Sequence, residues 1–284
     1  MLNLKFLNYE LKKDIDFVIE AEKSDVEKLS KDTKISKTTL NEIKRTNVTV
    51  NEVNEKFYSY VYDLGYRLNL VKEEFLKETN KLILYHCSKY GLEIVDSKGS
   101  KSNCDFGNGF YLGESYSSTL SFVFENKESS IYSFELDLND LKIVKFSCSL
   151  EWMLAICYYR GYLKKYKEHN IIKKITEKVE NADLIIAPIA DNRMFYIMSL
   201  FANADITDNV AIHSLSASSF GNQYVIKTEK ALNQLSSIEK YYVCQKEKEH
   251  YIELLNQRTN MIETKLKLSK REFRDGLYIE EILG

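Results

Sequence analysis

Three side chains that could do chemistry stand at the ends of β-rich runs in this sequence. His86 lies near the end of the run LILYHCS, Tyr111 lies in GFYLG, and Gln223 opens QYVIKT. A histidine can bind or transfer a proton, and a tyrosine ring can stack on a planar ligand. The amide of Gln223 can form hydrogen bonds but cannot accept a proton as a carboxylate would. The three positions are therefore candidates for a ligand site, and they raise the question whether the amide of Gln223 stands in the place of a catalytic carboxylate.

Further candidates follow Tyr111 along the chain. In CDFGNGFYLGESYSSTLSFV two glycines bracket a turn, and a helix predicted to start near Ser115 carries Thr119 and Phe122. Taken singly, such residues are usually structural, and a chain with 20 tyrosines and 14 phenylalanines buries many aromatic rings in its core. The functional signal lies in their combination and order.

That combination resembles a known family. YHCS, then DFGNGFYLG followed by a threonine and a phenylalanine, then NQYV resemble the ADP-ribosyltransferase superfamily. The similarity is to its histidine–tyrosine–glutamate branch, which includes the poly-ADP-ribose polymerases and diphtheria-type toxins, and especially to short bacterial members. It extends over about residues 82–240, where ADLIIAPIADNRMF also resembles a segment of that bacterial group. The resemblance implies a split antiparallel β-sheet with NAD, the substrate, bound in its cleft.

The first family motif implies roles for three neighbouring residues. His86 would bond the nicotinamide ribose. Cys87 stands where the family commonly has a glycine whose backbone holds the nicotinamide amide, and a backbone contact can survive that change. Ser88, the next residue of the motif, is also expected to contact NAD. No partner base is identifiable for Cys87, so it is not interpreted as a nucleophile.

The second family motif implies the walls of the nicotinamide site. Tyr111 and Phe122 would stack on the nicotinamide ring, Thr119 would bond its carboxamide, and Gly109 would lie against the ligand. Stacking fixes the leaving group while NAD loses nicotinamide through an oxocarbenium-like state.

The third motif normally supplies a glutamate, and Gln223 stands in its place. Loss of a general base costs about 10²–10⁴-fold, so mono-ADP-ribosylation is expected rather than chain building, and a Gln223→Glu variant is expected to turn over faster. The nearest carboxylate, Glu229, is predicted to open a helix behind Thr228, where an acid complements the helix dipole. Three more residues either line the cleft on the substrate side or form a turn that caps the next helix: Asp191, Asn192 and Arg193.

The elements that would hold these residues form an α+β domain at residues 79–240. Its β-rich runs are 82–88, 109–113, 130–137, 141–147, 183–190 and 223–228. Strands and helices do not alternate regularly, so a doubly wound sheet is not expected. Neither G-x-G-x-x-G between a strand and a helix nor G-x-x-x-x-G-K-[ST] occurs, which argues against Rossmann and P-loop nucleotide binding.

Residues 1–78 are predicted to form a separate all-α domain. Ser24 and Glu27 make a predicted capping box, and Ser36 is the predicted N-cap of the following helix. The stretch VEKLSKDTKISKTTLNEIKRTN resembles the helix–turn–helix of phage-repressor-like regulators, and residues 31–45 carry five basic against two acidic side chains. A dimerisation or partner-binding module is the alternative. The predicted DNA-binding residues are Lys37, Thr38, Asn41, Lys44 and Arg45.

Bulk properties exclude other classes. The net charge of −2 provides no global attraction to nucleic acid or membrane, and no apolar run approaches the length of a membrane span. The five cysteines are scattered without a C-x-x-C pair and the four histidines are dispersed, so we expect reduced thiols, a cytoplasmic location and no metal site. Residues 241–284 are densely charged with helical spacing and predict a helix or helical pair packed on the domain.

The expected function is NAD-dependent transfer of ADP-ribose to a macromolecular target, protein or nucleic acid. A helix–turn–helix on the same chain would suit a bacterial toxin with a cognate antitoxin, or a phage-defence effector, that binds its own operator DNA. Two alternatives remain open: a DNA-binding regulator that senses NAD or ADP-ribose without chemistry, and an NAD glycohydrolase.

Overall fold

The computed structural model describes residues 2–5, 7–120, 129–190, 192–216, 221–273 and 275–284. The strands are β1 (Leu2–Asn3), β2 (Ile83–Ser88), β3 (Ile94–Val95), β4 (Phe110–Gly113), β5 (Ser130–Leu136), β6 (Ile143–Lys145), β7 (Leu184–Pro188), β8 (Asn222–Ile226) and β9 (Leu235–Tyr242). The α-helices are α1 (Leu11–Ala21), α2 (Val26–Thr33), α3 (Lys37–Thr46), α4 (Asn51–Asp63), α5 (Leu68–Lys77), α6 (Tyr116–Leu120), α7 (Leu150–Tyr159), α8 (Asn170–Glu180), α9 (Asn192–Ala202), α10 (Asp208–Ser216), α11 (Glu229–Leu232), α12 (Gln245–Glu272) and α13 (Ile279–Leu283).

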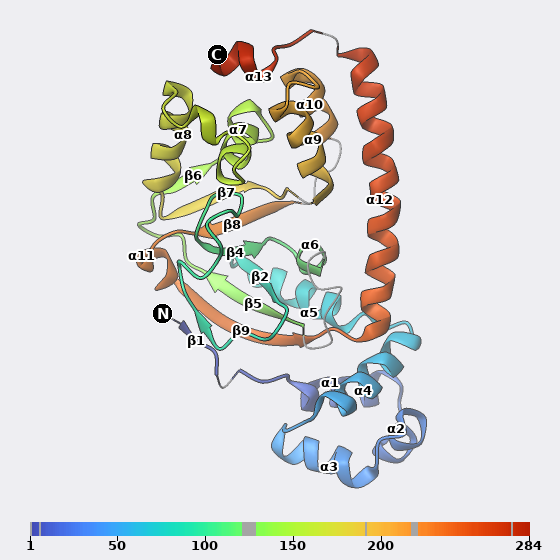
Figure 1. The fold of residues 1–284 in the computed structure, drawn as a ribbon. Helices are drawn as coiled ribbons and strands as arrows, with labels where there is room; N and C mark the ends of the chain where they lie inside the picture. The colour runs from blue at the N-terminus through green and yellow to red at the C-terminus, as the bar shows by residue number, and fades with distance from the viewer. Residues whose placement is uncertain (1, 6, 121–128, 191, 217–220, 274) are drawn as a thin grey trace.

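The fold is mixed α+β, with a central sheet between two groups of helices (Figure 1). Helices α1–α4 lie at one end of the sheet and α7–α10 at the other, and α12 runs along one side between the two groups (Figure 1). Helix α12 contacts α4 near its start and α9 and α10 further on. Within the described residues, no helix is both long enough and apolar enough to cross a membrane.

Seven strands of the described chain form one sheet in the order β6-β7-β8-β4-β2-β5-β9. Only β6 and β7 pair in parallel, and the other neighbours are antiparallel. All six predicted β-rich runs are strands, which confirms the mixed α+β class. Their bounds differ from the predicted ones by one or two residues, because strand ends depend on which residues find a ladder partner.

The sheet is nearly interrupted between β2 and β4. These strands share a single register pair, Tyr85 with Gly113, whereas β2 pairs with β5 along its whole length and β4 pairs with β8 along its own. Beyond that pair, Nδ1 of His86 lies 2.8 Å from the carbonyl oxygen of Tyr111. A side chain thus occupies a backbone acceptor that a continuous ladder would use, and the two strands diverge there.

Strand β9 corrects the prediction for the C-terminal segment. The residues from 241 on are predicted to be helical, yet the strand runs on to Tyr242 and pairs with β5 from Ser130 to Leu136. Its Tyr241 and Tyr242 are almost completely buried. Short alternating stretches of tyrosine and charged residues fit both periods, so the partner strand decides the outcome. The helix follows as α12, with the short α13 packed on the core around α7, α9 and α10.

The N-terminal helices start almost where the capping residues predict. Ser36 caps α3 by accepting the Thr39 N–H at 3.1 Å, as predicted. The capping box at Ser24 is wrong by one residue, because Asp25 is in the extended conformation of an N-cap and its carboxylate accepts the Lys28 N–H at 2.8 Å. Helices α2 and α3 share a small core that includes buried Leu29, Ile35, Leu40 and Ile43.

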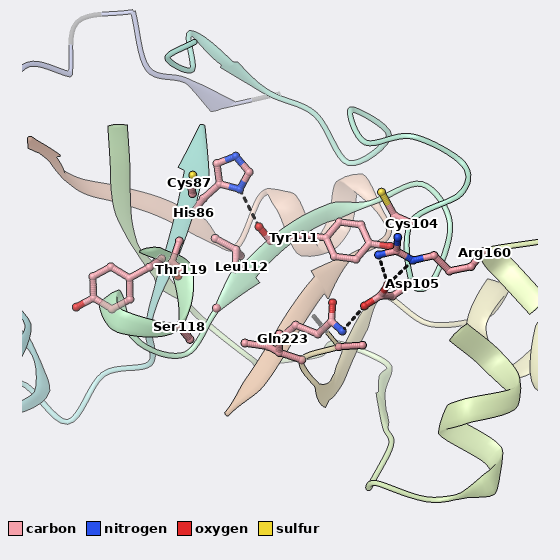
Figure 2. A pocket seen from close by; sticks show the side chains of 14 residues that line it. His86, Cys87, Cys104, Asp105, Tyr111, Leu112, Ser118, Thr119, Arg160 and Gln223 are labelled. Carbon is pink, nitrogen blue, oxygen red and sulfur yellow. Dashed lines mark hydrogen bonds and ion pairs between the residues drawn. The ribbon is translucent and has the colours of Figure 1, made fainter. Parts of the chain in front are cut away.

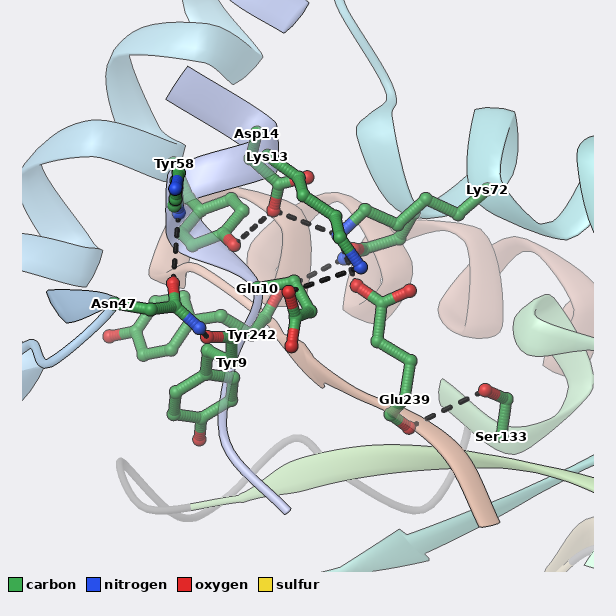
Figure 3. Close-up of polar contacts among 12 residues, drawn as sticks. Tyr9, Glu10, Lys13, Asp14, Asn47, Tyr58, Lys72, Ser133, Glu239 and Tyr242 are labelled. Atoms are coloured by element: carbon green, nitrogen blue, oxygen red, sulfur yellow. Dashed lines mark hydrogen bonds and ion pairs between the residues drawn. The ribbon is translucent and has the colours of Figure 1, made fainter. Parts of the chain in front are cut away.

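A buried ionic cluster joins the N-terminal helices to the sheet (Figure 3). Lys72 of α5 bonds Asp14 of α1 at 2.8 Å and Glu239 of β9 at 2.7 Å. Asp14 also accepts the hydroxyl of Tyr58 from α4. Burying a charge is tolerable only with such partners, so the cluster ties α1, α4 and α5 to the edge strand.

Helix α6, which carries Thr119, is held by a second buried polar group. The Tyr116 hydroxyl donates to Glu247 of α12 at 3.0 Å and accepts from Asn69 of α5 at 2.7 Å. Burial raises the pKa of Glu247 to about 7. Two helices from distant parts of the chain, α5 and α12, therefore fix the position of α6 beside β2 and β4.

Candidate functional site

A cavity of about 290 Å³ opens where β2 and β4 separate (Figure 2). His86 from β2, Tyr111 from β4, Thr119 from α6 and Gln223 from β8 all line it. The structure therefore brings together predicted site residues from four elements, of which β4 and α6 are neighbours in the sequence while β2 and β8 are separated from them. The split in the sheet is what makes room for them.

His86 presents one defined acceptor to this site. Its Nδ1 bonds the Tyr111 carbonyl at 2.8 Å, and since a carbonyl only accepts, Nδ1 carries the hydrogen. Burial lowers the pKa of the imidazole to about 4, while the bond to Tyr111 opposes that shift. At neutral pH the ring is uncharged, and Nε2 is left as a hydrogen-bond acceptor.

Tyr111 is anchored through its hydroxyl. The hydroxyl donates to the Gly107 carbonyl at 2.7 Å and accepts the Phe106 N–H at 3.0 Å. Burial raises its pKa above the ordinary value for tyrosine, and the nearby carboxylate of Asp105 adds to the shift. The hydroxyl oxygen is thus used in hydrogen bonds to the backbone of residues 106 and 107. The ring is the part of Tyr111 that remains for contact with a ligand.

A buried carboxylate lies at the far end of the cavity (Figure 2). Asp105 is 5% exposed, and its Oδ1 accepts from Arg160 Nε at 2.9 Å and Nη2 at 2.7 Å. Its Oδ2 accepts from Gln223 Nε2, also at 2.9 Å. Burial raises the pKa of Asp105 above its usual range, against the opposing effects of the Arg160 charge and the Gln223 amide. Gln223 itself is buried, and its Nε2 also lies 3.1 Å from the Pro188 carbonyl oxygen.

Asp105 and Arg160 are site residues that sequence reasoning misses. Asp105 stands inside the motif CDFGNGFYLG and is the only acid between residues 97 and 113, which is the signal that could have identified it. Arg160 directly follows the apolar helix α7, where a basic residue at a helix end is unremarkable. Only the fold brings either of them to Gln223.

Cys87 and Thr119 line the same cavity. Burial raises the pKa of the Cys87 thiol to about 12, so it is protonated at neutral pH, in line with a cysteine that is not a nucleophile. The Thr119 hydroxyl donates to the Ser115 carbonyl at 2.9 Å, which leaves its oxygen available as an acceptor.

Other predicted contacts lie outside the cavity wall. Ser88 donates to the Gly91 carbonyl. A Cβ at Gly109 would meet Val225 Cγ1 at 2.6 Å, so this glycine permits close packing of β4 on β8. Glu229 is exposed in the first turn of α11, where it bonds Ser97 at 2.8 Å, and the predicted N-cap Thr228 is confirmed.

Some predicted positions lie wholly or partly outside the described part of the chain. Phe122 and Asp191 lie outside the described residues, and only the backbone of Asn192 and Arg193 is described, as the first turn of α9. In the described part of the chain, no group of three or more His, Cys, Asp and Glu side chains could hold a metal ion.

The predicted DNA-binding residues lie on α3. Thr38 and Asn41 are exposed, whereas the three basic residues form ion pairs with acidic neighbours. Those pairs are Lys37 with Glu27 at 2.5 Å, Lys44 with Asp16 at 2.8 Å and Arg45 with Glu42 at 2.6 Å. Exposed ion pairs of this kind contribute little to stability, so a phosphate could displace the acidic partner.

Comparison with known proteins assigns the part of the chain that contains the cavity. No curated protein and no solved structure matches the sequence. The model of one protein family, described as a protein of unknown function (DUF3990), matches residues 82–237. That segment includes His86, Asp105, Tyr111, Arg160 and Gln223. The chain belongs to the DUF3990 family.

Proposed function

We propose that this protein is an NAD-dependent mono-ADP-ribosyltransferase. The observation that carries the proposal is the cavity in the divided sheet, whose wall contains His86, Tyr111, Thr119 and Gln223 together. These are the residues to which the sequence resemblance assigns contacts with the nicotinamide half of NAD. The cavity has a volume of about 290 Å³, close to the lower limit of about 300 Å³ for ligand pockets. This volume suits nicotinamide and its ribose, with the rest of NAD extending outward.

The hydrogen-bonding character of the wall supports a ribose. The uncharged His86 has Nε2 as its remaining acceptor, and the amide nitrogen of Gln223 is already used by Asp105 and Pro188. A ligand group that faces Nε2 of His86 or Oε1 of Gln223 must therefore supply donors, as the hydroxyls of a ribose do. The Thr119 oxygen is an acceptor for the carboxamide N–H, and the face of Tyr111 is available to the nicotinamide ring.

The chemistry of the pocket favours transfer to an acceptor that brings its own reactivity. An amide at 223 holds a hydroxyl but cannot take a proton from the attacking group. Bond cleavage would then depend on orientation of NAD and on exclusion of water from a largely apolar pocket. The acceptor of ADP-ribose is therefore a macromolecule whose nucleophile reacts without help from a base at 223. A macromolecular target is also what a toxin or a defence effector would modify.

Labelled NAD tests this function. The protein is incubated with NAD labelled in the adenylate half and with cell extract, and transfer of label and release of nicotinamide are both measured. His86→Ala and Tyr111→Ala should each lower transfer at least tenfold. The matched controls are His250→Ala and Tyr90→Ala, because both side chains are exposed and outside the cavity wall. Nicotinamide release without transfer would identify a glycohydrolase, and NAD binding without either product would identify a sensor and refute catalysis.

We further propose that α3 contacts DNA. The exposed Thr38 and Asn41 lie on the same short helix as Lys37 and Arg45, whose acidic partners are exposed and replaceable. Such a helix could place polar side chains at base edges and cations at phosphates. Binding to the DNA upstream of its own gene would connect expression of the protein to its activity.

A further inference from the structure

The orientation of the Gln223 amide is determined by its neighbours. Its nitrogen lies 2.9 Å from Oδ2 of Asp105 and 3.1 Å from the carbonyl oxygen of Pro188. Both neighbours accept hydrogen bonds, so the group that faces them must be the NH₂ and not the oxygen. Both amide hydrogens are used, and Oε1 is turned away from Asp105 (Figure 2).

Asp105 is itself held rigidly. Two nitrogens of Arg160 bond its Oδ1, and the Arg160 guanidinium lies 3.7 Å from the centre of the Phe195 ring. The backbone next to Asp105 is fixed as well, because Phe106 N–H bonds the Tyr111 hydroxyl. The carboxylate therefore cannot turn away from Gln223 without breaking several contacts.

We propose that Asp105 is the positioning residue of this cavity, and that its carboxylate makes glutamine the required residue at position 223. Asp105 and the Pro188 carbonyl hold the amide so that Oε1 faces the ligand as an acceptor. Asp105 thus supplies the carboxylate of the site, and Gln223 supplies the acceptor oxygen that faces the ligand. This inference rests on the proposed function for the identity of the ligand, since a ribose hydroxyl is the group that Oε1 would accept.

The arrangement reverses the simple expectation for Gln223→Glu. A glutamate oxygen in the place of Nε2 would lie against two acceptors at 2.9 and 3.1 Å. Two carboxylates at this separation cannot both be ionised without strong repulsion. The variant loses two hydrogen bonds and gains that repulsion, so it should lose stability and ligand binding instead of gaining turnover.

Exchanging the two functional groups should restore the contact. In the double variant Asp105→Asn with Gln223→Glu, an asparagine NH₂ faces a glutamate oxygen, and the asparagine oxygen remains for Arg160. The Pro188 carbonyl still faces an acceptor in this variant, so the recovery should be partial.

A neighbouring pair provides the matched control. Asn222 Nδ2 donates to Glu114 Oε2 at 2.9 Å, which is the same amide–carboxylate chemistry one residue earlier on β8. Neither residue lines the cavity, and both are partly exposed. Asn222→Asp and its exchange partner Glu114→Gln should change neither NAD affinity nor nicotinamide release.

The experiment is a double-mutant cycle read first as Tm without ligand and then as the Kd for NAD. Gln223→Glu should lower Tm by about 5 °C or more and weaken NAD binding at least tenfold. The exchanged double variant should recover at least half of both losses. If the single variant does not fold, recovery of a folded double variant is the supporting result.

Two results would overturn the proposal: a Gln223→Glu protein with unchanged Tm and faster nicotinamide release, or a double variant whose losses equal the sum of the single ones. The Tm cycle needs no ligand, so it separates the two hypotheses. A wild-type protein that does not bind NAD would refute the proposed function, while the cycle would still decide whether Asp105 positions Gln223.

Discussion

Replacing Tyr111 with phenylalanine separates the two parts of that side chain. The ring lines the cavity, while the hydroxyl bonds the Gly107 carbonyl at 2.7 Å and the Phe106 N–H at 3.0 Å. Gly107 has a φ of +73°, so the turn that these bonds hold is one that other residues rarely adopt. We therefore expect Tyr111→Phe to affect stability more than ligand binding.

The size of the effect follows from two backbone groups that lose the Tyr111 hydroxyl: the Phe106 N–H, and the Gly107 carbonyl, which keeps only a 3.4 Å bond from the Ser100 hydroxyl. An unsatisfied buried polar group costs about 1–3 kcal/mol, and the remaining Ser100 bond to the Gly107 carbonyl places the sum near the low end, at about 2 kcal/mol. For a protein of this size, each kcal/mol lowers Tm by about 2–4 °C, so the variant should melt about 4–8 °C below the wild type. Because the ring is kept, NAD affinity should fall by less than about fivefold.

Thermal unfolding and NAD binding by calorimetry would test this, with Tyr90→Phe as the control because Tyr90 is 79% exposed. The control should match the wild type in both measurements. Tyr111→Ala, which removes the ring as well, should lose both stability and binding. An unchanged Tm together with lost NAD binding in Tyr111→Phe would refute the reasoning, since it would mean that the hydroxyl contacts the ligand.

Three further predictions concern charge. His86 has a pKa of about 4 in the folded protein against about 6.5 when unfolded. The unfolded chain therefore takes up its proton first as the pH falls, and up to about 3 kcal/mol of stability is lost between pH 6.5 and 4. Urea unfolding across that range should show a shallower pH dependence for His86→Gln, and an identical slope would contradict the assignment. Lys72→Met leaves buried Asp14 without its cation and should cost about 3–5 kcal/mol, whereas Lys37→Met, at an exposed pair, should cost less than about 1 kcal/mol in the same denaturation assay. Replacing Lys37 and Arg45 by alanine should weaken binding to upstream DNA and reduce the salt dependence of log K by about 2, and unchanged anisotropy titrations would exclude α3 as the contact.

Many helices and strands could be predicted from short stretches of sequence, because interactions between neighbouring residues determine them. Ser36 and Thr228 cap the helices that follow them, since a hydroxyl two or three residues before a free backbone N–H needs no distant partner. Apolar runs such as 183–190 form strands because so continuous a run must be buried on both faces. The N-cap of α2 was predicted one residue too early, at Ser24. Ser24 and Asp25 are both residue types that cap helices, and the extended backbone at Asp25 makes it the N-cap.

Strand β9 shows where local pattern fails. Residues 235–242 alternate weakly, and the charged helix that follows them masks the change of period. Their strand conformation comes from pairing with β5, more than 90 residues earlier in the chain. An edge strand of this kind has no sequence signal that is independent of its partner.

By itself, the sequence determined the mixed class, the strands that carry His86, Tyr111 and Gln223, and the absence of a carboxylate at 223. Those properties belong to residue types and short periods, which a chain retains before it folds. Only the tertiary structure decided that Asp105 and Arg160 reach the same cavity, because a hydrogen bond across 118 residues depends on how β4, β8 and α7 pack. The amide at 223, which the sequence shows only as the absence of a carboxylate, is held in place by the carboxylate of Asp105.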